Sequence, residues 1–228
     1  MPLPSVIRGL TPDRLRDSPS VRAVALASGL IPPRPMHSAA EAQLLKRFAA
    51  GSRCVVELGV YEGSSAYVLC DALDRYADLH LVDPFVDTSK WAMRPGWHGT
   101  PFATRLAVRR RTKDDGPNVR WHIARSQDIG RSWQGPQPDF VFIDGDHSSP
   151  AVREDWEVWH PHVRAGGAVA FHDARHSQPG GGGSPGPTDV VDEIFRARSA
   201  PAEWRIAAEV DTLVVVQRAA SQPTTGVG

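Results

Sequence analysis

Val55-Val56-Glu57-Leu58-Gly59-Val60-Tyr61-Glu62-Gly63-Ser64-Ser65 is the stretch that decides the fold, because an apolar run gives way to a turn with two glycines and then to a helical pattern. Residues 54–58 predict a buried strand, residues 64–76 a helix and residues 79–82 a second strand. This order is typical of a βαβ unit, so the two strands are expected to be parallel. Gly59 and Gly63 leave room for backbone N–H groups to approach a ligand at the turn.

An acidic residue, Asp83, follows the second strand and lies 20 residues after Gly63. An acid in this place can hold both hydroxyls of a ribose. Each glycine alone is typical of an ordinary turn, and Asp83 alone of a structural cap, but together and in this order they favour a nucleoside site. A dinucleotide requires another glycine where Tyr61 stands, and Glu62 adds negative charge near its pyrophosphate. S-adenosylmethionine (SAM) carries a sulfonium and an ammonium and no phosphate, so it fits Glu57 and Glu62 better.

The remainder of the chain continues the alternation of helices and strands. The predicted fold class is α/β, with a Rossmann-like, mostly parallel sheet that ends in an antiparallel hairpin. A glycine- and proline-rich stretch, residues 178–187, is expected to be an irregular flexible loop, and Thr188 is expected to cap the helix that follows it. The patterns predict helices over residues 20–28, 39–50, 101–111, 151–163 and 189–198, and strands over residues 119–124, 140–143, 168–171, 204–208 and 213–217.

Length and composition restrict the class of protein. The 228 residues suffice for one domain, expected over 38–220, with a proline-rich arm over 1–37 and a disordered tail over 221–228. The 26 basic and 26 acidic residues cancel, so neither a nucleic acid nor an anionic membrane is an expected partner. Cys54 and Cys70 lack metal-binding spacing, no stretch is long enough to span a bilayer, and the first residues lack the pattern of a signal peptide. A cytoplasmic protein with reduced thiols is therefore expected.

Polar side chains follow the fourth and fifth predicted strands. Asp144 comes directly after the fourth strand and Asp173 closely follows the fifth, so both are expected side by side at the carboxyl edge of the sheet. Two carboxylates there favour a hard divalent cation such as Mg2+, which makes a bound hydroxyl more acidic. His147 is close enough to remove the hydroxyl proton as a general base. His172 either binds the same ion, which would favour Mn2+ or Zn2+, or faces the substrate.

Three motifs together resemble one family: Glu57-x-Gly59-x-x-x-Gly63, Leu81-Val82-Asp83 and Phe142-Ile143-Asp144-Gly145-Asp146-His147. They are similar to class I SAM-dependent methyltransferases, and specifically to the macrocin-type sugar O-methyltransferases and their cephalosporin-hydroxylase-like relatives, over residues 38–218. The resemblance implies a seven-stranded sheet, SAM as the cofactor, and adenine contacts at the exit of the third strand. The implied cofactor-binding residues are Glu57, Gly59, Tyr61, Gly63, Ser64, Asp83, Ser126, Gln127 and Asp144.

The resemblance also implies the chemistry of the second site. In that family a metal-ligating aspartate is followed three positions later by a histidine base, and Asp144 and His147 match this pattern. The family usually carries a Glu-Asp pair after the fifth strand, whereas this chain has His172 and Asp173. The implied metal ligands are therefore Asp144, His172 and Asp173, with Mg2+ as the expected ion and Mn2+ or another divalent ion as the alternative.

Metal-assisted O-methylation of a saccharide or glycosylated natural product is the leading functional hypothesis. The enzymatic alternative is a catechol-type O-methyltransferase acting on a phenolic small molecule, and the alternative from another class is a non-catalytic SAM-binding scaffold or sensor. A simple capped turn is the structural alternative for residues 144–147. Trp91, Trp97 and His98 are expected to stack on a ring of the acceptor. Residues 1–36 either cover the site or mediate a homo-oligomer.

Overall fold

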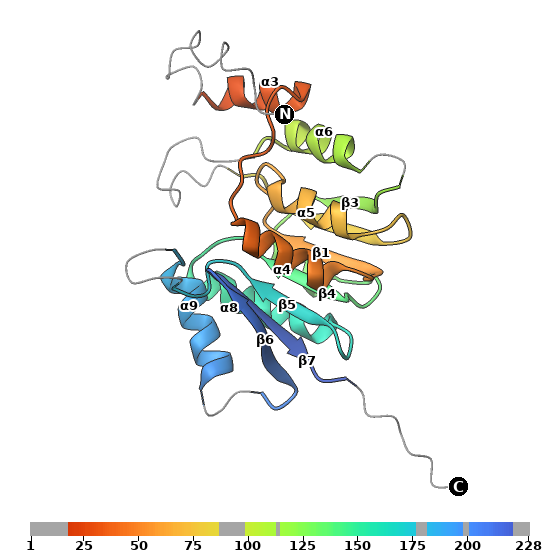
Figure 1. The fold of residues 1–228 in the computed structure, drawn as a ribbon. Coiled ribbons are helices and arrows are strands. Elements are labelled where there is room, and N and C mark those ends of the chain that lie inside the picture. Colours follow the sequence, from red (N-terminus) through yellow and green to blue (C-terminus); the bar gives the residue numbers. More distant parts are fainter. Residues whose placement is uncertain (1–17, 87–98, 113–114, 177–181, 198–200, 221–228) are drawn as a thin grey trace, which may run out of the picture.

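A computed structural model describes residues 18–86, 99–112, 115–176, 182–197 and 201–220 (Figure 1). The strands of its central sheet are β1 (Cys54–Leu58), β2 (Asp78–Val82), β3 (Asn118–His122), β4 (Phe140–Ile143), β5 (Ala168–Phe171), β6 (Trp204–Val210) and β7 (Leu213–Arg218). They lie in the order β3-β2-β1-β4-β5-β7-β6. β7 pairs antiparallel with both β5 and β6, and the other pairs are parallel. The expected seven-stranded, mostly parallel sheet with a C-terminal antiparallel hairpin is confirmed.

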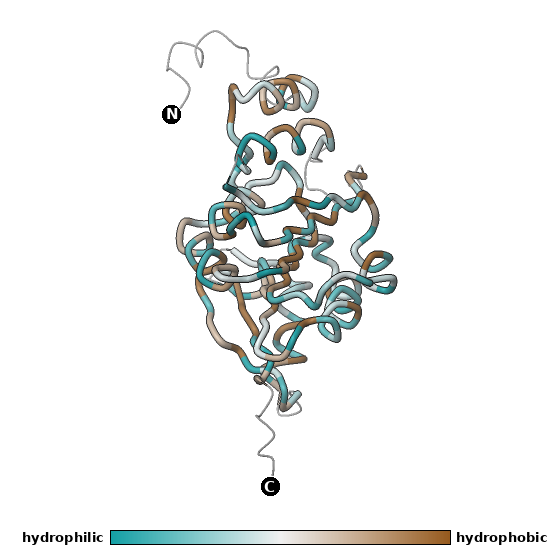
Figure 2. Tube along the Cα trace, turned by 90° about the vertical axis from the view of Figure 1, so that its right-hand side faces the viewer, coloured by the Kyte–Doolittle hydropathy of each residue, from teal (hydrophilic) through white to brown (hydrophobic). Residues whose placement is uncertain are grey.

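Helices cover both faces of this sheet, and α3 packs on α6. The described residues contain α3 (Pro19–Ser28), α4 (Ala39–Ala49), α5 (Ser64–Ala72), α6 (Pro101–Arg111), α7 (Ser126–Arg131), α8 (Ser149–Trp159) and α9 (Pro185–Val191). One apolar cluster joins α4, α5 and α6 to the sheet through Leu45, Leu69 and Val108. A second cluster joins α8 and α9 to the opposite face through Trp159 and Val190. Figure 2 shows the hydrophobic strands gathered in the middle of the molecule.

The three central strands explain why their sequences are almost continuously apolar. Every residue of β1, β4 and β5 is buried, because helices cover both sides of these strands. Trp156 and Trp159, three residues apart on α8, are both buried, as their spacing predicts. Cys54 and Cys70 are free, buried thiols and fill the core.

Several helices differ from the sequence prediction, among them α8, which spans Ser149–Trp159 rather than residues 151–163. α5 ends at Ala72 rather than at residue 76, because the chain turns at Asp74, whose carboxylate accepts the N–H of Tyr76 at 2.8 Å. α7 has no counterpart among the predicted helices, because six residues are too few to show an apolar period. The turn into α7 also ends β3 at His122 rather than at residue 124.

The stretch predicted to be an irregular loop over residues 178–187 is partly helical, which corrects that prediction. α9 begins at Pro185, where the missing N–H and the preset φ of proline suit the first turn of a helix. Ser184 therefore occupies the N-cap position, and Thr188 lies inside the helix rather than at its cap. After α9 the chain continues as a π-helical turn, Asp192–Arg196, rather than as an α-helix to residue 198.

The described part of the N-terminal arm packs on the domain at α6 (Figure 1). Leu26 of α3 lies against Ala103 and Ala107 of α6. The guanidinium of Arg110 donates to the carbonyl oxygens of Leu26 and Ala27 near the end of α3. The predicted tail, residues 221–228, and the first 17 residues lie outside the described residues. Within the described part of the chain, no helix combines the length and apolar character required to cross a membrane.

Candidate active site

The glycine turn after β1 is held in a conformation that requires its glycines. Gly59 has φ +87° and Gly63 has φ +89°, both in the left-handed region. A β-carbon on Gly59 would lie 2.1 Å from the carbonyl oxygen of Asp144, so no other residue fits there. Ser64 is the first residue of α5, directly after the turn. The glycine turn therefore lies directly against the segment that follows β4. The predicted cofactor site and the predicted metal site require this closeness.

Asp83 holds the glycine turn from the neighbouring strand. One oxygen of its carboxylate accepts the N–H groups of Val60 at 2.8 Å and Tyr61 at 2.9 Å, and the other accepts the N–H of Phe85 at 2.6 Å. These bonds correspond to the cap that is the alternative role of Asp83. Each carboxylate oxygen has more than one lone pair, so a ribose contact remains compatible with the cap and stays a prediction.

The two glutamates of the turn do not offer free charges. Glu57 is fully buried, its Oε1 accepts the hydroxyl of Ser65, and its Oε2 has no hydrogen-bond partner among the described residues. Burial raises the pKa of Glu57 well above its ordinary value. The carboxylate of Glu62 pairs with the guanidinium of Arg22 in α3 and accepts the N–H of Arg34 at 2.7 Å. The charge of Glu62 is therefore already paired within the described residues.

The predicted adenine-binding residues contact an acid that sequence patterns do not reveal. The hydroxyl of Ser126 donates to Oδ1 of Asp155 at 2.5 Å, and the amide of Gln127 donates to the same atom at 2.9 Å. Asp155 lies on α8 and is buried, and this burial raises its pKa to about 7. No local pattern identifies Asp155, because it meets α7 only through the tertiary packing of α8. An adenine contact by Ser126 and Gln127 stays a prediction.

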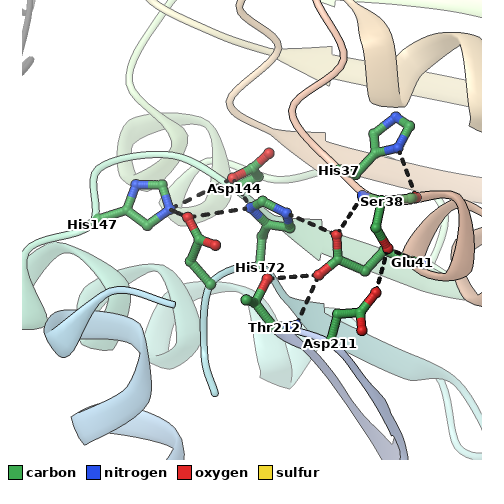
Figure 3. A network of polar contacts seen from close by, with 9 residues as sticks. His37, Ser38, Glu41, Asp144, His147, His172, Asp211 and Thr212 are labelled. Atoms are coloured by element: carbon green, nitrogen blue, oxygen red, sulfur yellow. Dashed lines mark hydrogen bonds and ion pairs between the residues drawn. The ribbon is translucent and has the colours of Figure 1, made fainter. Parts of the chain in front are cut away.

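The second cluster lies where β4 and β5 end, as the parallel strands predict (Figure 3). Oδ1 of Asp144 is 3.1 Å from Nδ1 of His172 and 3.7 Å from Nε2 of His147. Oδ2 of Asp173 is 3.4 Å from Nε2 of His147 and 3.7 Å from Nδ1 of His172. The structure therefore brings together all four side chains that the sequence predicts for metal binding and proton transfer.

A fifth side chain, Glu41 of α4, joins this cluster without being predicted for it. Its Oε2 lies 3.7 Å from Nε2 of His172, on the side of the ring that faces away from Asp144 (Figure 3). Ser38 and Glu41 form a capping box, in which each side chain accepts the backbone N–H of the other residue. The spacing Ser38-x-x-Glu41 signals such a box, but it gives no indication that the glutamate reaches the end of β5.

The carboxylates of the cluster set the protonation of its histidines. Burial alone lowers the pKa of His172, but Asp144, Glu41 and Asp173 outweigh it and raise the pKa to about 11. Burial also lowers the pKa of His147, and Asp173 and Asp144 again reverse the direction. For Asp173, burial raises the pKa, but the two imidazoles outweigh this effect and lower it. The carboxylates of the cluster therefore stabilise positive charge on its two histidines.

The donor atoms of the cluster fit a divalent cation. Asp144, His147 and His172 each offer one ligand atom, and these atoms lie within 4.8 Å of one another. Nε2 of His147 and both ring nitrogens of His172 are buried without a hydrogen-bond partner among the described residues. Buried polar atoms are almost always satisfied in folded proteins, and these nitrogens are available to a metal ion.

The described end of the glycine-rich stretch closes one side of the cluster. The N–H of Ser184 donates to the carbonyl oxygen of Asp173 at 2.7 Å. A β-carbon on Gly186 would lie 2.0 Å from the carbonyl oxygen of His147, so this segment packs closely against the backbone of His147. Trp91, Trp97 and His98, the residues predicted to contact an acceptor, lie outside the described residues.

The sheet order, the glycine turn after β1 and the acid after β2 define a Rossmann-like enzyme of the nucleoside-binding class. The sequence model of a family described as a methyltransferase domain matches residues 56–174, just over half of the chain. The chain therefore belongs to this methyltransferase family, and the expected class I SAM-dependent methyltransferase is confirmed at that level.

Solved structures with the same fold include several methyltransferases. TomG, an O-methyltransferase from Streptomyces achromogenes in complex with SAM, has a TM-score of 0.56 at 18% identity over 94% of each chain. The O-methyltransferase from Bacillus cereus in complex with S-adenosylhomocysteine (SAH) has a TM-score of 0.57 at 16% identity over 92% of each chain. A methyltransferase from Geobacter sulfurreducens has a TM-score of 0.56 at 15% identity, over 95% of this chain and 94% of that chain. Identities this low establish the shared fold alone.

Proposed function

We propose that the chain is a SAM-dependent, metal-assisted O-methyltransferase that acts on a hydroxyl of a saccharide or glycosylated natural product. One observation carries the proposal: Nε2 of His147 lies 3.4 Å from Asp173 and 3.7 Å from Asp144. This imidazole lies at the same sheet edge as the glycine turn, which touches the backbone of Asp144. A proton acceptor next to a methyl-donor site is what methylation of an alcohol oxygen requires.

The side chains of the site divide the reaction into positioning and proton transfer. When bound, SAM supplies an electrophilic methyl group, and a divalent cation supplies positive charge that acidifies the acceptor hydroxyl. His147 accepts the hydroxyl proton at Nε2. The carboxylates of Asp144 and Asp173 stabilise the imidazolium that forms, since they raise the pKa of His147 in spite of its burial. Gly59, Gly63 and Asp83 shape the turn that receives the cofactor.

Two observations support an oxygen as the methylated atom and a sugar as the acceptor molecule. TomG and the Bacillus cereus protein, which share the fold, are O-methyltransferases by name. The spacing of Asp144 and His147 matches the metal-binding aspartate and histidine base of the macrocin-type sugar enzymes. His172 stands where those enzymes have an acid, so the sugar class rests on the shared spacing rather than on the complete set of ligands.

Methyl transfer from SAM with a labelled methyl group tests the proposal. A deoxysugar-bearing macrolide and 3,4-dihydroxybenzoate serve as acceptors, and His147→Ala is compared with the wild type. We expect labelled macrolide, a loss of roughly 100-fold or more in kcat for His147→Ala, and an unchanged Kd for SAH by calorimetry. His160→Gln, at the far end of α8, is the control and should keep full activity.

Each contrary result has a defined meaning. Methylation of the catechol alone would replace the sugar class by the catechol class. Binding of SAH without methylation of either acceptor would favour a SAM-binding scaffold. Full activity of His147→Ala would remove His147 as the base.

A further inference from the structure

Glu41 is a buried carboxylate that is oriented by the ends of two other elements. Only 3% of it is exposed. Its Oε1 accepts the N–H of Thr212 at 2.9 Å and the hydroxyl of Thr212 at 2.6 Å, and its Oε2 accepts the N–H of Ser38 at 2.8 Å. The carboxylate held in this way lies beside the ring of His172.

The ring of His172 lies between two carboxylates. Nε2 is 3.7 Å from Oε2 of Glu41, and Nδ1 is 3.1 Å from Oδ1 of Asp144 (Figure 3). The side chain is 6% exposed, and neither nitrogen makes a hydrogen bond to the described residues. Histidines that bind metals are commonly held in this way, with one nitrogen toward a carboxylate and the other toward the ion.

The charge of the cluster requires a cation. Glu41, Asp144 and Asp173 place three carboxylates around one buried imidazole. Protons on His172 and His147, or a bound ion, would offset their negative charge. Mg2+ prefers oxygen ligands in an octahedral arrangement, whereas imidazole suits Fe2+, Ni2+ and Zn2+. A nitrogen ligand at this point therefore fits Mg2+ poorly and the later transition ions well.

We propose that Asp144 and Nδ1 of His172 bind a divalent transition-metal ion in preference to Mg2+, and that Glu41 is the positioning residue that orients His172 through Nε2. His147 offers the third donor atom of the cluster, and we assign its Nε2 to the proton transfer described above rather than to the ion. The inference rests on the proposed function, because it concerns the metal of the same site, but its test reads metal binding separately from methyl transfer.

Cobalt is the probe, because the visible absorption of Co2+ reports nitrogen ligation. Metal-stripped full-length protein is titrated with Co2+, and competition with Zn2+, Mn2+ and Mg2+ gives the relative affinities. We expect one Co2+ per chain, with Mg2+ at least about tenfold weaker than Zn2+. His172→Asn should lose the nitrogen-ligand absorption, and Glu41→Gln should weaken Co2+ binding roughly 10- to 100-fold with a shifted spectrum.

Matched variants separate positioning from folding. Asp211→Asn alters the neighbouring bond from the hydroxyl of Ser38 without touching His172, and it should leave the Co2+ spectrum unchanged. If Glu41→Gln does not fold, Thr212→Val replaces it, since this change removes one donor from Glu41 and keeps its charge. The Thr212→Val protein should also show a shifted spectrum.

The results that overturn the inference differ from those that overturn the function. A wild type that binds no transition ion, prefers Mg2+, or keeps its Co2+ spectrum in His172→Asn removes the metal proposal. An unchanged Co2+ affinity and spectrum in both Glu41→Gln and Thr212→Val removes the role of Glu41. Full methyl transfer by metal-free protein removes the metal from the proposed reaction and leaves the methyltransferase intact, whereas Co2+ binding without methylation of any acceptor supports this inference and contradicts the function.

Discussion

Gly59 lies against the backbone of Asp144, so closely that a β-carbon on Gly59 would come within 2.1 Å of the Asp144 carbonyl oxygen. Gly59, the first residue of the glycine turn, and Asp144, the first residue after β4, therefore cannot move independently. A side chain at Gly59 would disturb both halves of the candidate site at once.

Gly59→Ala should destabilise the protein by about 3 kcal/mol or more, because the alanine adds a clash to the cost of a positive φ. Gly51→Ala is the control, since Gly51 has φ +77° but a β-carbon added there would meet no atom within 4 Å. That variant should cost only about 1 to 2 kcal/mol. Urea unfolding followed by circular dichroism measures both. Equal losses of stability in the two variants would show that Gly59 has room for a β-carbon beside Asp144.

Asp155→Asn should change the pH dependence of stability. Burial raises the pKa of Asp155 from 3.8 to about 7, so the folded protein binds this proton more tightly than the unfolded chain does. The resulting stability is complete below about pH 4 and is lost as the pH rises to about 7. The asparagine still accepts from Ser126 and is never charged, so the variant should gain about 2 to 4 kcal/mol at pH 8 and little at pH 4. Urea unfolding at pH 4 and at pH 8 measures the change in stability. An equal effect of the substitution at the two pH values would contradict the raised pKa of Asp155.

Asp83→Asn should weaken SAH binding roughly 10- to 100-fold, because bonds to a charged acceptor contribute about 1.5 to 3 kcal/mol. Calorimetry with SAH and with its 2′-deoxyribose analogue separates the two roles of Asp83. If Asp83 also holds the ribose, the variant should distinguish the two ligands less well than the wild type does. Unchanged discrimination would leave Asp83 only as the cap of the turn.

Glu62→Gln should loosen α3, because the carboxylate of Glu62 accepts both from Arg22 of α3 and from the backbone of Arg34. Amide hydrogen exchange over residues 19–28 should become faster, with a loss of about 1 to 3 kcal/mol for a largely buried charged pair. Glu154→Gln is the control, since the Arg131–Glu154 pair is exposed and should contribute under about 1 kcal/mol. If amide exchange over residues 19–28 is no faster in Glu62→Gln than in Glu154→Gln, Glu62 does not hold α3 in place.

The sheet and much of the candidate site follow from local patterns. Parallel strands bring their carboxyl ends to one edge, so Asp144 and Asp173 could be placed together from the positions of the strands that precede them. The apolar runs of β4 and β5 identify those strands, because both faces of each are covered. The glycine turn could be predicted from the sequence alone, because Gly59 and Gly63 follow directly after an apolar strand.

The remaining parts depend on packing between elements that are distant in sequence. Glu41 signals the start of a helix, but its approach to His172 depends on how α4 docks on the sheet. Asp155 looks like one more polar residue of a helix until α8 brings it to Ser126. The start of α9 escapes prediction because composition suggests a flexible loop, whereas Pro185 suits a first helical turn.

The bond between Glu41 and Thr212 joins residues 171 positions apart, and it has a consequence for the order of folding. During synthesis, the segment with β1, the glycine turn and β2 leaves the ribosome long before β6 and β7 exist. Glu41 lacks its two donors from Thr212 until the last hairpin docks, and closing so long a loop is slow. The two donors of Thr212 therefore reach Glu41 only after the glycine turn and the strands on either side of it have been made.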